Sequence, residues 1–255
     1  MEIVHFDPNG DYAEYEELTL KKDQFEKEAD LYQRAYTREF GDLITESFQL
    51  KIDCIALKKE IAFYVKAQNQ GKKVTPEEVQ EYLDRHMSSY RAELADMMKK
   101  RDASKNATPI SGYEEEQIKK LYRRLAKLLH PDISPLTADY PVLYELFQQV
   151  IIAYKCNDLK ALRKLEVLIN KELEDNGIEG FDVIVPDMQD RIEELEKDID
   201  DIINSIPYVY KNLLEDREAV AEKKADLQSE IDEYRKYKEE LTEKLEEIKG
   251  GENGG

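Results

Sequence analysis

The chain has 255 residues, of which 57 are acidic and 38 basic, so its formal net charge is −19. This acidic balance argues against general nucleic-acid binding and against docking on anionic lipid, because both require basic side chains that meet phosphate groups. Two cysteines and three histidines, far apart in the sequence, predict neither a disulfide framework nor a metal site. No cofactor is predicted.

The N-terminal residues 1–10 form a short segment that closes in the turn signal Asp7-Pro8-Asn9-Gly10. They lack the basic and apolar regions of a secretory signal. Nowhere does the sequence approach the run of about 18 uncharged apolar residues that a membrane span requires. We therefore expect a cytoplasmic protein with no membrane partner.

Residues 11–103 are predicted to form a long helix and an antiparallel partner helix. Between residues 12 and 70 there is no proline, and from Phe25 to Tyr64 apolar residues recur in steps of three and four, as in a coiled coil. Asn69-Gln70-Gly71 ends this helix. Thr75-Pro76-Glu77-Glu78 begins the next one as a capping box with proline in the first turn, and that helix runs to about Lys100.

A helix over residues 112–130 opens at a second capping box, formed by Ser111 and Glu114. One face is apolar, and the other carries five basic residues with no acidic residue between Gln117 and His130. A basic island on an acidic molecule favours an acidic partner, through steering and charge complementarity. The five basic residues are Lys119, Lys120, Arg123, Arg124 and Lys127.

This helix ends in His130-Pro131-Asp132. The stretch Tyr122-Arg-Arg-Leu-Ala-Lys-Leu-Leu-His130-Pro131-Asp132 resembles the second helix and loop of J domains, whose pattern is Tyr-Arg-Lys-Leu-Ala-x-x-x-His-Pro-Asp. After a loop of suitable length, Phe147-Gln-Gln-Val-Ile-Ile-Ala-Tyr154 is similar to the third J-domain helix. Two blocks in the correct order and spacing make residues 110–175 a J-like domain by resemblance.

The resemblance implies an antiparallel helical hairpin and a function. J domains dock on DnaK-type chaperones and accelerate their ATP hydrolysis, so the chain would be a co-chaperone and not itself an enzyme. Carried over, the five basic residues of helix 112–130 dock on the chaperone, and His130, Pro131 and Asp132 trigger its ATPase. The hairpin core would consist of Tyr122, Leu125, Phe147, Val150 and Tyr154.

The sequence departs from the family pattern on both sides of the hairpin. No counterpart of the first J-domain helix directly precedes residue 112. Either the helix ending near Lys100 serves in that place, or the domain is reduced. The third helix extends beyond the usual length to about Glu174, with a bend near Asn157-Asp158. Neither a Gly/Phe-rich region nor a zinc-binding Cys-x-x-Cys repeat occurs in the sequence, so the common client-handling parts are missing.

Residues 176–186 are predicted to be a linker, residues 187–249 a helical hairpin, and residues 250–255 a flexible tail. One arm of the hairpin has Ile192, Leu195 and Ile199 in heptad register, and Lys238 occupies a polar seam position on the longer arm. The unmatched length of the longer arm needs another partner, for which the N-terminal helix is the natural candidate. The arms can pair within one chain or, as a homodimer, between two copies.

The expected fold is all-α, an elongated helical bundle with coiled-coil arms around a J-like hairpin. The first functional hypothesis is a J-type co-chaperone whose helical arms bind a specific client or scaffold protein. The alternative is a non-catalytic structural adaptor with a degenerate J-like hairpin. An enzyme is not predicted, because no phosphate-binding glycine loop and no Ser/His/Asp or Cys/His grouping can be identified.

Overall fold

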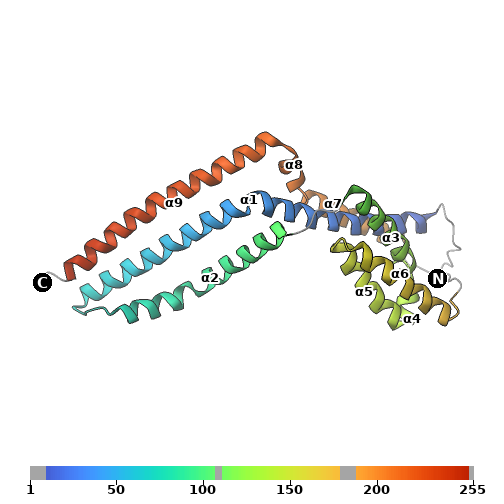
Figure 1. Cartoon of the computed structure of the whole chain (residues 1–255), viewed down its shortest axis with the longest axis horizontal. Coiled ribbons are helices and arrows are strands. Elements are labelled where there is room, and N and C mark those ends of the chain that lie inside the picture. Colours follow the sequence, from blue (N-terminus) through green and yellow to red (C-terminus); the bar gives the residue numbers. More distant parts are fainter. Residues whose placement is uncertain (1–9, 107–110, 179–187, 253–255) are drawn as a thin grey trace. The chain divides into compact units, whose positions relative to one another are not determined.

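A computed structural model describes residues 10–106, 111–178 and 188–252, which form helices and no strand (Figure 1). The prediction of an all-α fold is confirmed. The predicted N-terminal segment up to residue 9, residues 179–186 of the predicted linker and the last three residues of the predicted tail lie outside the described residues. In chain order the helices are α1 (Asp11–Asn69), α2 (Pro76–Asn106), α3 (Gly112–Leu129), α4 (Leu136–Asp139), α5 (Pro141–Lys155), α6 (Leu159–Asp175), α7 (Met188–Asn204), α8 (Tyr210–Glu215) and α9 (Arg217–Glu252).

The chain divides into two compact units. The first unit comprises residues 1–32 and 108–209, and the second comprises residues 33–107 and 210–255. The boundary falls inside α1, between Tyr32 and Gln33, so α1 contributes to both units. Helices α3 to α7 belong to the first unit, and α2, α8 and α9 belong to the second.

Helix α3 begins and ends where its sequence dictates. The Ser111 hydroxyl accepts a hydrogen bond from the Glu114 amide at 3.2 Å, and the Glu114 carboxylate accepts one from the Ser111 amide at 3.2 Å. This capping box satisfies two of the amide groups that a helix start leaves free. The His130 amide still donates to the Ala126 carbonyl, but Pro131 has no amide hydrogen to continue the helix.

Helices α3 and α5 form an antiparallel pair. The rings of Tyr122 and Tyr154 stack with centroids 3.8 Å apart, and the rings of His130 and Phe147 make a T-shaped contact with centroids 5.5 Å apart. The pairs run in opposite directions along the two helices, which gives the antiparallel order. Each predicted core residue of the hairpin is buried, at 3% exposure or less: Tyr122, Leu125, Phe147, Val150 and Tyr154.

The third predicted helix is broken at the expected bend. Helix α5 ends at Lys155, Asn157 takes a positive φ of 56°, and the Asp158 carboxylate caps α6 by accepting from the Ala161 amide at 2.8 Å. Asparagine tolerates this left-handed backbone better than most residues. Helix α6 then packs its buried face, which includes Leu162 and Ile169, into the same core.

The start of α1 completes the core of the first unit. Tyr12, Tyr15 and Leu20 are buried in the same apolar cluster as α3 and α5, and the Tyr12 hydroxyl donates to the Ile133 carbonyl at 2.7 Å. Helix α7 joins this cluster through Met188, Ile192 and Leu195. The helix ending near Lys100 was one candidate for the place of the first J-domain helix. That helix is α2, which lies in the second unit, and α1 packs against the J-like pair instead.

In the second unit, α1 and α2 are antiparallel neighbours. Ile52 of α1 is buried with Met87 and Leu94 of α2. Farther along, the Arg38 guanidinium donates to the Ser104 carbonyl at 3.0 and 3.1 Å. A side chain at Gly41 would place its Cβ only 3.1 Å from Arg101 Cγ, so glycine allows this close approach.

Helix α9 runs parallel to α1 in the second unit (Figure 1). Its ion-pair partners on α1 rise together with its own residue numbers: Lys224 with Glu39, Arg235 with Glu46, Lys238 with Asp53 and Lys249 with Glu60. Its apolar residues Leu241 and Leu245 are buried with residues of α1 and α2. The long C-terminal arm therefore takes the N-terminal helix as its partner, as the sequence indicates, and Lys238 finds a carboxylate at its seam position.

The division into units differs from the expected domain boundaries. We expected α7 and α9 to form a hairpin over residues 187–249, but α7 shares the core of the first unit and α9 that of the second. A heptad pattern shows that a helix needs an apolar partner without showing which one. The apolar face of α7 is buried in the core of the first unit, and that of α9 is buried in the second.

Candidate functional site

The tripeptide His130-Pro131-Asp132 forms a tight turn at the end of α3. The amides of Ile133 and Ser134 donate to the His130 carbonyl at 2.9 and 2.7 Å. The Asp132 amide donates to His130 Nδ1 at 3.2 Å. Because Nδ1 accepts, the neutral imidazole carries its proton on Nε2. The turn thus fixes both the backbone and the orientation of the histidine ring.

The two ionisable residues of the turn have opposite surroundings. The His130 side chain is only 12% exposed, against the edge of Phe147, whereas the Asp132 side chain is 60% exposed. His130 Nε2 lies 3.6 Å from Asp23 Oδ2 of α1. His130 is therefore held from inside the unit, and Asp132 is the charged group of the turn that a partner can reach.

Asp23 connects α1 to the J-like pair. The Tyr122 hydroxyl donates to Asp23 Oδ2 at 2.6 Å, on the same oxygen that faces His130. Burial raises the pKa of the Asp23 carboxyl, and the Tyr122 hydrogen bond and the His130 ring oppose this rise without cancelling it. Burial and the Asp23 carboxylate together hold the pKa of Tyr122 far above its ordinary value, so Tyr122 remains a donor.

A lysine and an aromatic pair continue this cluster into the unit. Lys27 of α1 is 1% exposed, and its Nζ lies 3.8 Å from the centroid of the Tyr154 ring, which stacks on Tyr122. A cation over an aromatic face is stabilised by the ring quadrupole, most strongly where water is excluded. Half-buried Asp23 and buried Lys27 of α1 thus lie beside the predicted site.

All five predicted docking cations form ion pairs in the structure. Lys119 and Lys120 pair with glutamates one turn earlier on α3, at 3.1 and 3.5 Å. The other three reach acids elsewhere in the first unit: Arg123 pairs with Glu17 of α1, Lys127 with Glu16 of α1, and Arg124 with Glu166 of α6.

This pairing differs from the expectation of a free basic face. Arg123 and Glu17 are 106 positions apart in the sequence, and Lys127 and Glu16 are 111 apart. A sequence window around α3 contains no acid between residues 117 and 130, and cannot show carboxylates that only folding brings there. The five cations are thus contiguous in the sequence, but in the folded chain carboxylates neutralise most of their charge.

Sequence reasoning missed several residues of α1 that lie at the site, among them Asp23 and Lys22. Lys22 donates a hydrogen bond to Asp198 of α7. Burial alone would lower the pKa of Lys22, but that hydrogen bond and the nearby carboxylates, Asp132 included, raise it. One feature of the sequence could have indicated that the start of the long helix packs against a partner. Its apolar face begins at Tyr12, Tyr15 and Leu18, well before Phe25.

A small cavity of about 250 Å³ adjoins the basic side of α3, between α3 and α6. Lys120 and Arg124 line it from α3, and Arg163 and Glu166 from α6. The side chains of Lys120 and Arg124 are about two-thirds exposed, at 68% and 66%. This is the part of the predicted docking face that remains most open to solvent.

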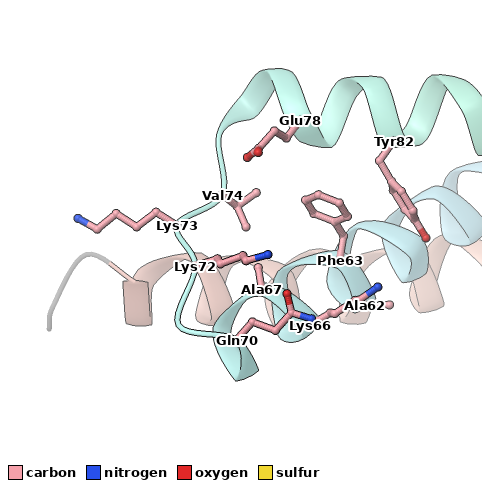
Figure 2. Close-up of a pocket in the computed structure, with 10 residues that line it drawn as sticks. All are labelled: Ala62, Phe63, Lys66, Ala67, Gln70, Lys72, Lys73, Val74, Glu78 and Tyr82. Atoms are coloured by element: carbon pink, nitrogen blue, oxygen red, sulfur yellow. The ribbon is translucent and has the colours of Figure 1, made fainter.

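A second cavity, of about 430 Å³, lies at the turn between α1 and α2 in the second unit (Figure 2). Phe63 and Tyr82, with ring centroids 4.9 Å apart, form its aromatic wall. Lys66 and Lys72 also line it, while the Glu78 carboxylate accepts from the Thr75 amide at 3.0 Å. No residue that the sequence predicts to be functional lines this cavity.

Among the described residues, no group of three or more His, Cys, Asp or Glu side chains could hold a metal ion. None of the described helices is long and apolar enough to cross a bilayer. No family model matches the sequence, and no curated protein or solved structure is significantly similar to the chain.

Proposed function

We propose that this chain is a co-chaperone of the J-domain type, which docks on a DnaK-type ATPase and accelerates its ATP hydrolysis. One observation carries the proposal: His130-Pro131-Asp132 forms the tip of an antiparallel helix pair, and the helix leading to it presents five cations. The chain itself catalyses nothing in this proposal, because it changes the rate of its partner. The proposal includes a cytoplasmic location shared with that partner.

The geometry supports different roles for the tip, which would make a specific contact, and for α3, which would attract the partner. Asp132 is exposed and Pro131 precedes it, so its carboxylate can meet a cationic group of the chaperone at a fixed place. His130 is mostly buried and accepts the Asp132 amide, so it positions the tip. Lys120 and Arg124, the most exposed of the α3 cations, supply attraction to an acidic docking surface, which chiefly increases the association rate.

The second unit provides the remaining part of the proposal, the binding of a client or scaffold protein. The second unit consists of parts of α1 and of α2 and α9, and contains none of the residues that resemble a J domain. The aromatic cavity at the turn between α1 and α2 gives it a concave surface (Figure 2). A chaperone recruited by the first unit would then be delivered to whatever the second unit holds.

The alternative is a structural adaptor whose J-like pair has lost chaperone docking. One specific observation favours it: each of the five cations already has a carboxylate partner within the chain. In this alternative the ion pairs serve only to hold α1 and α6 on α3, and Asp132 contacts no chaperone.

Single-turnover ATP hydrolysis by a DnaK-type chaperone distinguishes the two functions. We expect the wild-type chain to accelerate hydrolysis, and Asp132→Asn or His130→Gln to abolish the acceleration. Asp139→Asn is the matched control, because Asp139 is an exposed aspartate seven residues later in α4. Absence of acceleration by the wild type at saturating concentration would exclude the co-chaperone and leave the adaptor.

A further inference from the structure

The start of α1 presents carboxylates to the cations of α3. Glu17 pairs with Arg123, and Glu16 with Lys127, one turn farther along α3. Acids of a distant helix therefore face the basic side of α3.

This arrangement matches what a docking partner must offer. Lys119, Arg123 and Lys127 are four residues apart and share one stripe of α3. Two of these three cations are engaged by α1. Under the proposed function, a chaperone that docks here has to supply carboxylates to the same stripe. Glu16 and Glu17 of α1 already supply two carboxylates there.

We propose that Glu16 and Glu17 of α1 are a built-in competitor, whose carboxylates occupy the docking stripe until the acidic surface of the chaperone displaces them. This inference rests on the proposed function. The helix itself does not leave, because Tyr12, Tyr15 and Leu20 are buried in the core and the Tyr12 hydroxyl is bonded to Ile133. What is exchanged is the partner of each charged side chain.

Exposure makes such an exchange feasible. The side chains of Arg123 and Lys127 are 38% and 48% exposed, so both remain in contact with water while paired. The Glu17 carboxylate is 55% exposed and the Glu16 carboxylate 18%, so solvent weakens the Arg123–Glu17 pair more than the Lys127–Glu16 pair. The competitor does not block docking. The apparent affinity equals the intrinsic affinity multiplied by the fraction of molecules in which the stripe is free.

The test is the affinity of a DnaK-type chaperone for the full chain and for Glu16→Gln/Glu17→Gln, measured by titration at several salt concentrations. We expect the double variant to bind about fivefold more tightly, because two ion pairs that oppose docking are removed. The matched control is Glu14→Gln/Glu145→Gln, which makes the same change of charge at exposed glutamates of the first unit. This control should bind like the wild type.

The salt dependence separates competition from a general charge effect. Salt weakens docking, and it also weakens the internal ion pairs that oppose docking. The wild type should therefore lose affinity with rising salt less steeply than Glu16→Gln/Glu17→Gln. A double variant whose affinity and salt dependence equal those of the control would overturn the competitor, and so would a variant that binds more weakly.

The outcome for the proposed function is read from a different measurement. If the wild type accelerates ATP hydrolysis and the double variant shows no gain in affinity, the co-chaperone function is supported and the competitor role of α1 is excluded. If neither protein accelerates hydrolysis at saturating concentration, both proposals fall. Far-UV circular dichroism of each variant verifies that the helices remain intact.

Discussion

The hydrogen bond between Tyr122 and Asp23 is a contact between distant residues that stabilises the first unit. It joins α1 to α3 in a largely buried environment, 2.6 Å from oxygen to oxygen. Hydrogen bonds to a charged acceptor are stronger than neutral ones, and a buried carboxylate that loses its donor carries an unpaid desolvation cost.

Tyr122→Phe should therefore lower the free energy of unfolding by about 1–3 kcal/mol. Urea-induced unfolding measures this difference. Tyr144→Phe is the matched control, since Tyr144 is 45% exposed on α5 and removal of its hydroxyl should cost less than about 0.5 kcal/mol. Equal effects of the two substitutions would mean that the Tyr122 hydroxyl contributes nothing to stability.

The raised pKa of Asp23 makes a second prediction, about pH. A carboxyl whose pKa is higher in the folded than in the unfolded chain stabilises the fold below its unfolded pKa. That contribution is lost as the pH rises through the folded value. The ordinary value is 3.8, and burial raises it in the fold. Wild type should thus lose stability relative to Asp23→Asn as the pH increases from below 3.8 toward neutrality.

The measurement is the difference in unfolding free energy between wild type and Asp23→Asn over that pH range. Asparagine can still accept the Tyr122 hydroxyl, so the comparison isolates the titration of the carboxyl. A difference that stays constant with pH, or that grows toward acid in favour of the variant, would contradict a raised pKa of Asp23.

At the residue scale, sequence reasoning identified the J-like hairpin core and the tip but not their partners on α1. Tyr122, Phe147 and Tyr154 stood out because local spacing places them on facing sides of two successive helices. Glu17 and Asp23 could not be recognised in this way, because their contacts with α3 depend on where a distant helix docks. The local pattern carries no information on that docking.

At the scale of elements, helix starts and stops were the most predictable features. The capping box at Ser111, the stop at Pro131 and the bend at Asn157-Asp158 all lie where the sequence indicates, because each depends on neighbouring residues only. The pairing of α7 and α9 was predicted incorrectly as a hairpin, because an apolar stripe fits any partner stripe of similar register. The partners of α7 and α9 are determined by tertiary packing, in which α7 joins the first unit and α9 the second.

The pairing of α1 with α9 can be tested by thiol labelling, since the chain has one buried and one exposed cysteine. Cys54 is 3% exposed, and burial raises the pKa of its thiol; both effects slow its reaction. Cys156 should react with a thiol reagent in seconds to minutes, and Cys54 much more slowly.

Leu245→Ala should accelerate the labelling of Cys54 without changing that of Cys156. Leu245 is buried in the same cluster as Cys54, and truncating a buried leucine costs about 2–5 kcal/mol, which favours local opening. Leu168→Ala, at a 42% exposed position of α6, is the control and should leave both rates unchanged. If Cys54 in the wild type reacts as fast as Cys156, α9 does not cover α1.

At the scale of the whole molecule, charge and helix pairing determine how the chain associates with itself. The net charge of −19 produces mutual repulsion between copies, which opposes self-association. The sequence left open whether the long arms pair within one chain or between two. The apolar residues of α9, Leu241 and Leu245 among them, are buried against α1 and α2 of the same chain. A second copy is therefore not needed to cover them.

We expect a monomer of about 30 kDa, close to the chain mass of 29.9 kDa, in size-exclusion chromatography with light scattering. Raising the salt concentration screens the repulsion between copies, so a run at high salt is the more demanding condition. The mass should stay that of one chain there as well, because the apolar seam of α9 is already filled. A stable mass of twice this value would mean that α9 pairs between copies, and Leu245→Ala would then return the protein to one chain.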